Sequence, residues 1–249
     1  MKAMILAAGE GTRLRPLTDS LPKPMLPIGG RPALEYTVQW LRYYGIREIL
    51  INLHHCPETV IRHFGDGSAL GVSIEYSIEE RILGTAGGAK HRESFFDRPF
   101  VVVYGDVLTD LDLSDLVGYH STRGSNAHLT MSLYRVPDPT QCGVATLDAE
   151  GRVTSFVEKP NAGEAPSDLA SAGVLVLDPE ILRHVPEGRF CDYGHDVFPA
   201  LIQHGVPIYG WPLPDTAYLI DFGTPENYER VRRQWPTPRA HRFLGGCTA

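Results

Sequence analysis

Short apolar runs alternate with amphipathic segments through the first hundred residues, and this alternation restricts the fold more than any other feature of the sequence. The apolar runs have the length of buried strands, whereas the segments between them place apolar residues at helical spacing. Parallel strands need such helical crossovers, and the helices then cover both faces of the sheet. The expected strands are residues 3–8, 48–52, 72–76 and 99–103, and the expected helices are residues 33–44 and 58–64.

The pattern changes after residue 127, where strand-like runs follow one another with only short turns between them. Such runs predict mixed or antiparallel pairing, since a short turn joins antiparallel neighbours. These strands are expected at residues 128–136, 144–147, 153–158 and 172–177. Helices are expected at residues 179–185, 195–203 and 225–235, the last with Thr224 as N-cap and Pro225 at its first position.

Together these elements predict a Rossmann-like α/β fold with three layers, α/β/α, around a mostly parallel, mixed central sheet. A single domain over residues 1–235 is expected, because a chain of 249 residues with 43% hydrophobic content can bury one large core. The sequence has no hexapeptide period, so no C-terminal β-helix is expected. Residues 236–249 show little periodicity and are expected to form a loose tail.

Charge and cysteine content narrow the functional classes. Lys and Arg number 23 against 30 Asp and Glu, a net charge of −7, which does not imply the basic surface that nucleic acids or anionic membranes require. The four cysteines are far apart and form no Cys-x-x-Cys pair, which argues against a zinc site or a disulfide framework. The apolar run at the N-terminus is too short for a signal peptide, so a cytoplasmic location is expected.

A glycine-rich segment follows the first apolar run, and Gly9 and Gly11 let its backbone N–H groups surround a phosphate. It is not a P-loop, because no Gly-Lys-Ser/Thr closes it, and it is not the dinucleotide-binding fingerprint. Arg13 and Lys23 could neutralise phosphate charge, the first as a forked donor and the second as a compact point charge. Taken alone, these features are better explained as a solvated surface turn.

A longer pattern favours the phosphate-binding interpretation. Leu6–Arg13, followed by Pro22–Ile28, resembles the paired signature of the nucleoside-diphosphate-sugar pyrophosphorylases, also called sugar-phosphate nucleotidyltransferases. The resemblance covers roughly residues 1–232, and the form of Leu83–Gly87 is similar to that of mannose-1-phosphate guanylyltransferases. The further matching motifs are Tyr104–Asp106, Val157–Pro160, Asp196–Pro199 and Ile220–Asn227.

The resemblance implies an in-line attack by a sugar 1-phosphate on the α-phosphorus of a nucleoside triphosphate, with Mg²⁺ as cofactor and pyrophosphate as the second product. Arg13 would hold the triphosphate and the departing pyrophosphate, and Lys23 would neutralise charge near the α-phosphate. Asp106 and Asp221 would bind Mg²⁺, which typically takes one or two carboxylates plus phosphate oxygens. A lone aspartate after a strand is otherwise a turn or cap residue.

The nucleotide would be bound by the backbone of the first strand end and by a segment further along the chain. A carboxylate at Glu79 could accept hydrogen bonds from the N1 and N2 donors of guanine, which favours GTP, although a solvated strand end is the alternative for this residue. The residues implied in nucleotide binding are Leu6, Ala7, Ala8, Gly9, Gly11, Glu79, Gly84 and Thr85.

The sugar 1-phosphate would meet Lys159 through its phosphate and Glu158 through its hydroxyls. The alternative is an exposed ion pair, which contributes little to stability. Gly143 and a turn that contains Ala172 and Gly173 would line the sugar pocket, where glycine admits a sugar ring against the backbone. Many relatives have Asn where this chain has Ser171, so one hydrogen bond to the sugar is in doubt.

Two polar clusters are left over. The adjacent His54 and His55 follow a strand and would point to opposite faces, so loop packing is expected instead of a metal site. Asp192 lies in a polar group that could touch the sugar, and Asp196 is an alternative partner of the following helix N-terminus.

The sequence therefore predicts a sugar-1-phosphate nucleotidyltransferase, with GTP and mannose 1-phosphate or a related heptose or cyclitol phosphate as substrates. A thymidylyl-, uridylyl- or cytidylyltransferase acting on another sugar or alcohol phosphate is the alternative of the same class. Homo-oligomers are left open, and neither nucleic acid nor membrane is expected as a partner. A non-catalytic protein that binds nucleotide-sugars is the alternative of another class, against which the presence of Arg13, Lys23, Asp106 and Asp221 counts.

Overall fold

The computed structural model describes residues 1–123 and 127–244, and the chain forms two compact units. The first unit comprises residues 1–82, 103–111 and 216–249, so three separate stretches of chain meet in it. The second unit comprises residues 83–102 and 112–215. No helix among the described residues is both long and apolar enough to cross a membrane.

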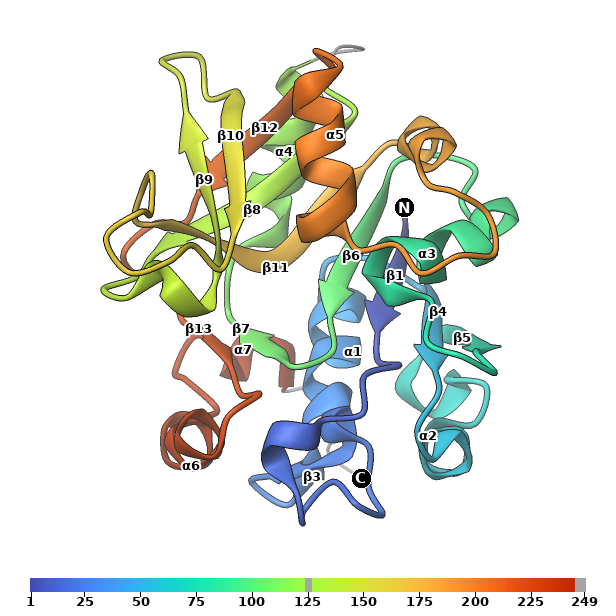
Figure 1. The fold of residues 1–249 in the computed structure, drawn as a ribbon. Coiled ribbons are helices and arrows are strands. Elements are labelled where there is room, and N and C mark those ends of the chain that lie inside the picture. Colours follow the sequence, from blue (N-terminus) through green and yellow to red (C-terminus); the bar gives the residue numbers. More distant parts are fainter. Residues whose placement is uncertain (124–126, 245–249) are drawn as a thin grey trace. The chain divides into compact units, whose positions relative to one another are not determined.

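The first unit is built on a parallel sheet. The strands β1 (Lys2–Leu6), β4 (Glu48–Leu53) and β5 (Ser73–Ile78) pair in parallel with β4 in the middle, and the crossovers contain α1 (Ala33–Tyr43) and α2 (Pro57–Phe64) (Figure 1). Their register places Leu6, Asn52 and Ser77 at the same level, next to the carboxyl ends of the strands. This edge of a parallel sheet is where such folds place their ligands.

Short elements complete the first unit. The strands β7 (Val107–Thr109) and β13 (Leu219–Asp221) form an antiparallel pair, and α6 (Pro225–Gln234) follows with Thr224 as its N-cap, as expected. The remaining elements are η1 (Thr12–Leu14), η2 (Lys23–Met25), β2 (Pro27–Ile28), β3 (Arg31–Pro32), η3 (Ser68–Leu70) and α7 (His241–Leu244).

The second unit has the expected mixed pairing. The strands β8 (Leu129–Arg135), β9 (Gly143–Leu147), β10 (Val153–Glu158) and β11 (Leu169–Leu177) pair antiparallel, and β12 (Ile208–Pro212) runs parallel to β8. The helices of this unit are α3 (Gly84–His91), α4 (Leu113–Thr122) and α5 (Phe198–Gln203), with short turns η4 (Glu93–Phe95), η6 (Pro139–Gln141), η7 (Pro179–His184) and η8 (Tyr193–Val197). The strand β6 (Phe100–Tyr104) begins in this unit and ends in the first.

Two segments expected to be α-helical are wound differently. Residues 179–184 form a 3₁₀ helix, and a π-helical stretch at residues 193–197 leads into α5. Asp192 caps this stretch, because its carboxylate accepts hydrogen bonds from the backbone N–H groups of Gly194 and His195, and the helical segment therefore begins two residues before the expected start at residue 195. At the start of α4, the Asp112 side chain accepts a hydrogen bond from the backbone N–H of Ser114.

The C-terminal segment is packed over its described part, in contrast to the loose tail expected for residues 236–249. Phe243 is buried, and its ring lies 6.2 Å from that of Tyr43 and 6.3 Å from that of Trp235. The hydroxyl of Thr237 donates to the buried carboxylate of Asp110 at 2.6 Å. Residues 245–249 lie outside the described residues, and the domain boundary at residue 235 stays a prediction.

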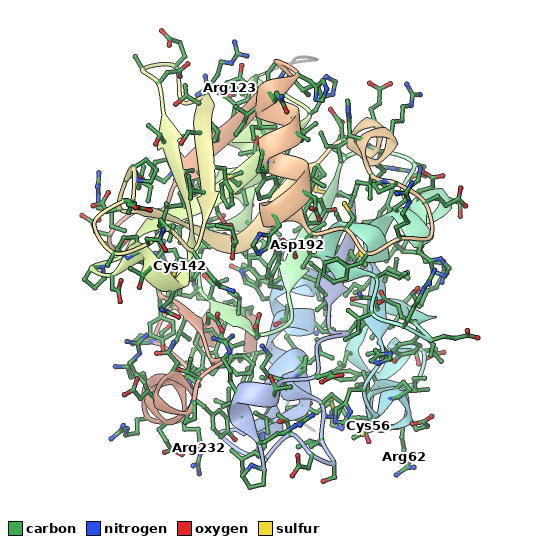
Figure 2. The ribbon with its side chains drawn as sticks, in the orientation of Figure 1. Cys56, Arg62, Arg123, Cys142, Asp192 and Arg232 are labelled. Carbon is green, nitrogen blue, oxygen red and sulfur yellow. The ribbon has the colours of Figure 1, made fainter. Side chains whose placement is uncertain are left out.

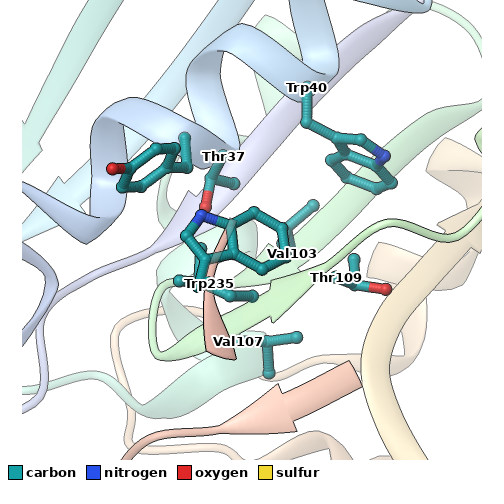
Figure 3. Close-up of a pocket in the computed structure, with 8 residues that line it drawn as sticks. Thr37, Trp40, Val103, Val107, Thr109 and Trp235 are labelled. Carbon is teal, nitrogen blue, oxygen red and sulfur yellow. The ribbon is translucent and has the colours of Figure 1, made fainter. Parts of the chain in front are cut away.

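Trp235 also closes the small pocket that Figure 3 shows within the first unit. Trp40, Val103 and Val107 are among the residues that line it, together with Thr37 and Thr109. Its volume of about 10 Å³ has room for about one water molecule. The pocket is therefore a packing gap between α1 and the strands and has no room for a substrate.

Because the C-terminal segment is packed, we expect Phe243→Ala to lower the free energy of unfolding by about 3 kcal/mol, as typical for loss of a buried aromatic ring. Chemical denaturation at equilibrium would measure the change. His241→Ala, at an exposed position of the same short helix, is the matched control and should change stability by less than about 0.5 kcal/mol. Equal stability of the two variants would show that this segment contributes nothing to the fold.

Candidate functional site

The glycine-rich loop after β1 folds back onto the segment that carries Lys23. The hydroxyl of Thr18 donates to the carbonyl oxygen of Gly11 at 2.8 Å. A methyl group added at Gly11 would lie 3.1 Å from the Thr18 side chain and 3.2 Å from Cβ of Lys23, so the two segments are in close contact. The loop thereby holds the Lys23 backbone beside the end of the first strand.

Four charged side chains of the first unit converge around Gly223. A Cβ atom at this glycine would lie 2.8 Å from Asp221 Oδ1, 2.9 Å from Arg13 Nη2 and 3.3 Å from Lys23 Nζ. Lys23 Nζ also donates to Asp106 Oδ2. The structure therefore brings together the two cations and the two carboxylates that the sequence predicted as catalytic and metal-binding residues.

Pairing between β7 and β13 sets the position of the two carboxylates. Asp221 is the register partner of Val107, and the backbone N–H of Phe222 donates to the carbonyl oxygen of Asp106 at 3.0 Å. The Asp221 side chain accepts from the backbone N–H of Gly223 at 2.6 Å. Asn227 Nδ2 donates to the carbonyl oxygen of Asp221 at 2.7 Å, so α6 is tied to the same point.

The electrostatics of this cluster favour a cation. Burial and the neighbouring charge of Asp106 raise the pKa of Asp221 to about 6, against the opposing effects of Lys23 and Arg13. The negative charge at Asp221 is thus unfavourable when only the protein surrounds it. Two carboxylates at one end of a strand pair fit Mg²⁺, which takes few protein ligands and completes its shell with phosphate oxygens and water.

Glu79 is buried, at 4% exposure, and is not the solvated strand end that was the alternative for it. Asn52 Nδ2 donates to Glu79 Oε1 at 2.8 Å, and Asn52 Oδ1 accepts from the backbone N–H of Ala7 at 2.9 Å. The predicted nucleobase residue is therefore linked to the predicted nucleotide-binding backbone of the first strand end through a third residue, Asn52.

Gly84 and Thr85, in the second unit, begin α3 against the segment of Cys191 and Asp192. Gly84 has a positive φ of 80°, and a Cβ atom there would lie 2.9 Å from the Cys191 carbonyl carbon. Thr85 Oγ1 donates to Asp192 Oδ2 and accepts from the backbone N–H of Tyr193, both at 2.8 Å. The Thr85 hydroxyl therefore holds two protein segments together.

Glu158 and Lys159 end β10, in the second unit. Glu158 lies on the same face of the strand as the buried Phe156, and its side chain is 20% exposed. Burial is the main cause of a raised pKa at Glu158, which Asp192 raises further and Lys159 opposes. Lys159 has a positive φ of 48° and a side chain that is 59% exposed, with its Nζ 3.8 Å from Glu158 Oε1.

Two glycines flank the Glu158 carboxylate. Gly143 is its register partner on β9, and an added Cβ atom there would collide with Glu158 Oε2 and with the Phe156 ring. A Cβ atom at Gly194 would lie 2.6 Å from the same oxygen. The carboxylate is thus held between backbone segments that only glycine permits, and Figure 2 labels Asp192 at the start of the second segment.

The Ala172 and Gly173 segment lies inside β11, so the expectation of a turn there needs correction. Pairing with β8 shifts register between Ser171 and Leu175, and Gly173 has a positive φ of 70°. The segment is therefore a bulge within a strand. Ala172 is buried, at 2% exposure.

Comparison with known proteins identifies the family of this chain. The family model described as nucleotidyl transferase matches residues 2–236. The chain belongs to the nucleotidyl transferase family. It is 40% identical to a UTP–glucose-1-phosphate uridylyltransferase of Synechocystis over 93% of its length, and 40% identical to a mannose-1-phosphate guanylyltransferase of Mycobacterium tuberculosis over 96% of its length. The chain spans 63% and 68% of the lengths of these two relatives.

Two solved structures share the fold of this chain. A putative glucose-1-phosphate thymidylyltransferase from Bacillus anthracis, solved in complex with a sucrose, matches with a TM-score of 0.85 and 25% identity over 97% of this chain and 99% of that one. HddC from Yersinia pseudotuberculosis, in complex with GMP-PN, matches with a TM-score of 0.77 and 26% identity over 94% and 99% of the two chains. These matches confirm the predicted α/β fold with a mostly parallel, mixed central sheet.

Sequence patterns assigned no individual role to several residues that position the side chains of either unit of this nucleotidyl transferase family member. Asn52, Asn227 and Gly223 were missed, although Asn52 is a polar residue at the end of an apolar strand, a signal that could have found it. Gly194 and Gly223 were both missed because the sequence does not show that side chains of distant residues lie close to these two glycines. The roles of Leu6, Ala8, Gly9, Gly143, Ala172 and Gly173 as ligand contacts stay predictions.

Other clusters of this nucleotidyl transferase have structural roles. His54 Nδ1 is 2.7 Å from the carbonyl oxygen of Glu79 and His55 Nε2 is 2.8 Å from that of Thr18, which confirms loop packing. Asp110 accepts from the backbone N–H of Tyr218. Cys56 and Cys191 are free thiols, and Cys247 lies outside the described residues.

The charged cluster predicts that a substitution of Asp221 changes stability and activity in opposite directions. The folded-state pKa of about 6 lies above the ordinary value near 4, so the ionised group disfavours the folded state increasingly as the pH rises between these values. We expect Asp221→Asn to abolish turnover and yet to raise the free energy of unfolding of the chelator-treated protein at pH 7.5, on the order of 1 kcal/mol.

Denaturation of both proteins at pH 7.5 and pH 4 after chelator treatment measures this effect, and the difference should shrink at the lower pH. Asp110→Asn is the control, because its buried carboxylate accepts two hydrogen bonds within the fold and its loss should destabilise. A loss of stability at pH 7.5 for Asp221→Asn as large as that for Asp110→Asn would contradict the proposed relief of unfavourable charge.

Proposed function

We propose that this chain is an enzyme that transfers a nucleotidyl group from a nucleoside triphosphate to a sugar 1-phosphate. The observation that carries the proposal is the convergence of Arg13, Lys23, Asp106 and Asp221 around Gly223. Cations that neutralise a triphosphate and carboxylates that hold a metal are the groups that phosphoryl-group transfer requires, since its catalysis is mainly positioning and charge stabilisation. Non-catalytic binding does not require this set.

In the proposed reaction, an oxygen of the sugar 1-phosphate forms a bond to the α-phosphorus of the triphosphate. The bond from the α-phosphorus to the bridging oxygen breaks, and its electron pair leaves with pyrophosphate. Arg13 stabilises the charge that develops on pyrophosphate, and Lys23 neutralises the α-phosphate. Mg²⁺, when bound by Asp106 and Asp221, would supply further charge neutralisation and orient the phosphate oxygens.

Contacts within the protein fix the position of the Lys23 side chain before substrates bind. Its Nζ donates to Asp106 while its side chain is only 14% exposed, so the position of the ammonium group is already fixed by the protein. A charged group that is oriented in advance needs little rearrangement when charge develops on the substrate. Arg13 Nη2 lies beside the same glycine, 2.9 Å from the place where a Cβ atom at Gly223 would be.

GTP is the proposed nucleotide because a buried carboxylate, Glu79, lies in the predicted nucleobase segment. Guanine presents adjacent N1 and N2 donors, whereas the edge of uracil has one donor between two carbonyl oxygens that a carboxylate would repel. The names of the mycobacterial guanylyltransferase and of the HddC complex with GMP-PN support this choice. The uridylyltransferase and thymidylyltransferase relatives keep UTP and dTTP as the alternatives.

The proposed sugar-phosphate contacts are Lys159 for the phosphate and Glu158 for sugar hydroxyls. Glu158 is held between Gly143 and Gly194, so its carboxylate has a fixed position, whereas Lys159 is exposed and can reach an anion. Mannose 1-phosphate or a related heptose or cyclitol phosphate is the proposed acceptor. The proposed location is cytoplasmic, and the proposed partners are these small molecules, with self-association left to experiment.

Turnover with separate nucleotides tests the function. Incubation with Mg²⁺, mannose 1-phosphate and each of GTP, dTTP, UTP, CTP and ATP should release pyrophosphate most rapidly with GTP. Asp106→Asn, which removes a proposed metal carboxylate and the Lys23 partner, is the inactive control. Release with a different nucleotide would keep the chemistry and replace the base, whereas binding of nucleotide without turnover on a panel of sugar and alcohol phosphates would favour the non-catalytic binder.

The role of Lys159 predicts a selective loss of acceptor affinity. Lys159→Ala should raise KM for the sugar phosphate by about 10-fold or more, because a charge-assisted hydrogen bond to phosphate is lost. The KM for the nucleotide should change little. Arg183→Ala, which removes a surface cation whose side chain is 79% exposed in the same unit, is the control and should leave both constants unchanged. An unchanged KM for the acceptor would remove Lys159 from the site.

A further inference from the structure

The carboxyl ends of β1, β4 and β5 bury a group of polar side chains. Asn52 is 2% exposed, Ser77 is 3% exposed and Glu79 is 4% exposed. The register places Asn52 directly beside Ser77, and Glu79 continues the pairing beyond β5, since its backbone N–H donates to the carbonyl oxygen of Leu53 at 2.8 Å. Polar groups are costly to bury unless each has a partner, so their arrangement at one edge of the sheet calls for an explanation.

The orientation of the Asn52 amide is fixed by the backbone. The N–H of Ala7 can only donate, so the Asn52 oxygen must face it, and the two atoms lie 2.9 Å apart. The NH₂ group of Asn52 then faces Glu79 Oε1 at 2.8 Å. A 180° rotation of the amide would place donor against donor at Ala7. Asn52 therefore always presents a donor to residue 79.

This fixed donor limits what residue 79 can present to a ligand. A carboxylate can give one oxygen to Asn52 and still offer acceptor capacity through its other oxygen. A glutamine at the same position would have to give its only oxygen to Asn52, and its NH₂ group would point away from Asn52. When residue 79 is a glutamine, the side chain at position 52 thus sets whether it offers an acceptor or a donor to a ligand, whereas a glutamate there offers an acceptor.

Ser77 provides an independent sign of a ligand at this place. Its Oγ is buried and has no hydrogen-bond partner among the described residues, although it lies beside Asn52 in the register. Hydroxyl groups buried in this way generally have a partner. A polar ligand at the ends of β4 and β5 would supply it.

We propose that Asn52 is a positioning residue that holds one oxygen of residue 79 and so fixes what its other atom presents to the nucleobase, an acceptor for guanine when residue 79 is glutamate and a donor for uracil when it is glutamine. The inference rests on the proposed function, because it places the nucleobase beside Glu79. With Asn52 and Glu79, the site offers an acceptor and favours guanine, whose N1–H and N2–H donate. With Asn52 and a glutamine, it would offer a donor to a uracil carbonyl oxygen.

The inference is tested by exchanging the hydrogen-bond donor and acceptor between positions 52 and 79. Four proteins are compared, namely the wild type, Glu79→Gln, Asn52→Asp and the double variant that carries both substitutions. For each, the ratio of the affinity for GTP to that for UTP is measured by calorimetry with Mg²⁺, and the ratio of kcat/KM is measured with mannose 1-phosphate. Affinity is the primary readout, so the result does not depend on turnover.

We expect Glu79→Gln to lower the GTP-to-UTP ratio by about 10-fold or more, the usual scale for reversal of one base-reading hydrogen bond. Asn52→Asp alone should weaken binding of both nucleotides, because two carboxylates would face each other. In the double variant, the carboxylate introduced at position 52 would accept from the glutamine NH₂, the glutamine oxygen would turn toward the base, and the ratio should return to within about 3-fold of the wild type.

A double variant with the same low ratio as Glu79→Gln would overturn the inference, since a residue with only a structural role could not restore selectivity. Thermal unfolding of all four proteins checks that they fold. If the double variant does not fold, Asn52→Ala in the Glu79→Gln background replaces it, and the freed glutamine should lose the preference for UTP; an unchanged preference would also overturn the inference.

The outcomes separate this inference from the proposed function. Nucleotide binding that follows the expected pattern without pyrophosphate release would keep the role of Asn52 and reject the enzyme. Turnover by the wild type with ratios that are insensitive to both positions would keep the enzyme and reject the role of Asn52. Absence of GTP and UTP binding by the wild type would reject both.

Discussion

The proximity of two carboxylates, Asp106 and Asp221, is the constraint on which the candidate active site depends. The pairing of β7 with β13 holds them at one point, and burial together with their mutual repulsion raises the pKa of Asp221. The structure tolerates this unfavourable arrangement because Lys23 and Arg13 oppose it. Additional positive charge would reduce the repulsion between the two carboxylates, and the negative charge of phosphates would be attracted by Lys23 and Arg13. A site that transfers phosphate groups needs both.

Much of this arrangement follows from local sequence patterns. Alternating apolar runs and amphipathic helices predicted the parallel strands of the first unit, and short turns predicted the antiparallel strands of the second. The cap at Thr224 was also predicted, because capping depends on a side chain and the backbone only a few residues away. Each of these signals lies within a window of a few residues.

The remaining features depend on contacts between distant segments. The packing of Phe243 requires the ring of Tyr43, about 200 residues earlier in the chain, together with that of Trp235. For Glu79, the sequence predicted a role but left its burial open, because the partner, Asn52, lies on a different strand. A residue's neighbours across a sheet are set by register, which single-sequence patterns specify only in part.

The two glycines beside Glu158 have a consequence for how such a chain can diversify. Gly143 and Gly194 come from different segments, and the missing side chain of each would occupy space at the same carboxylate oxygen. The position of this carboxylate therefore depends on two separate codons, each a single nucleotide change from alanine, whose methyl group would displace the carboxylate. Either substitution would change the surroundings of Glu158 in the second unit and would leave the residues of the charged cluster in the first unit unchanged.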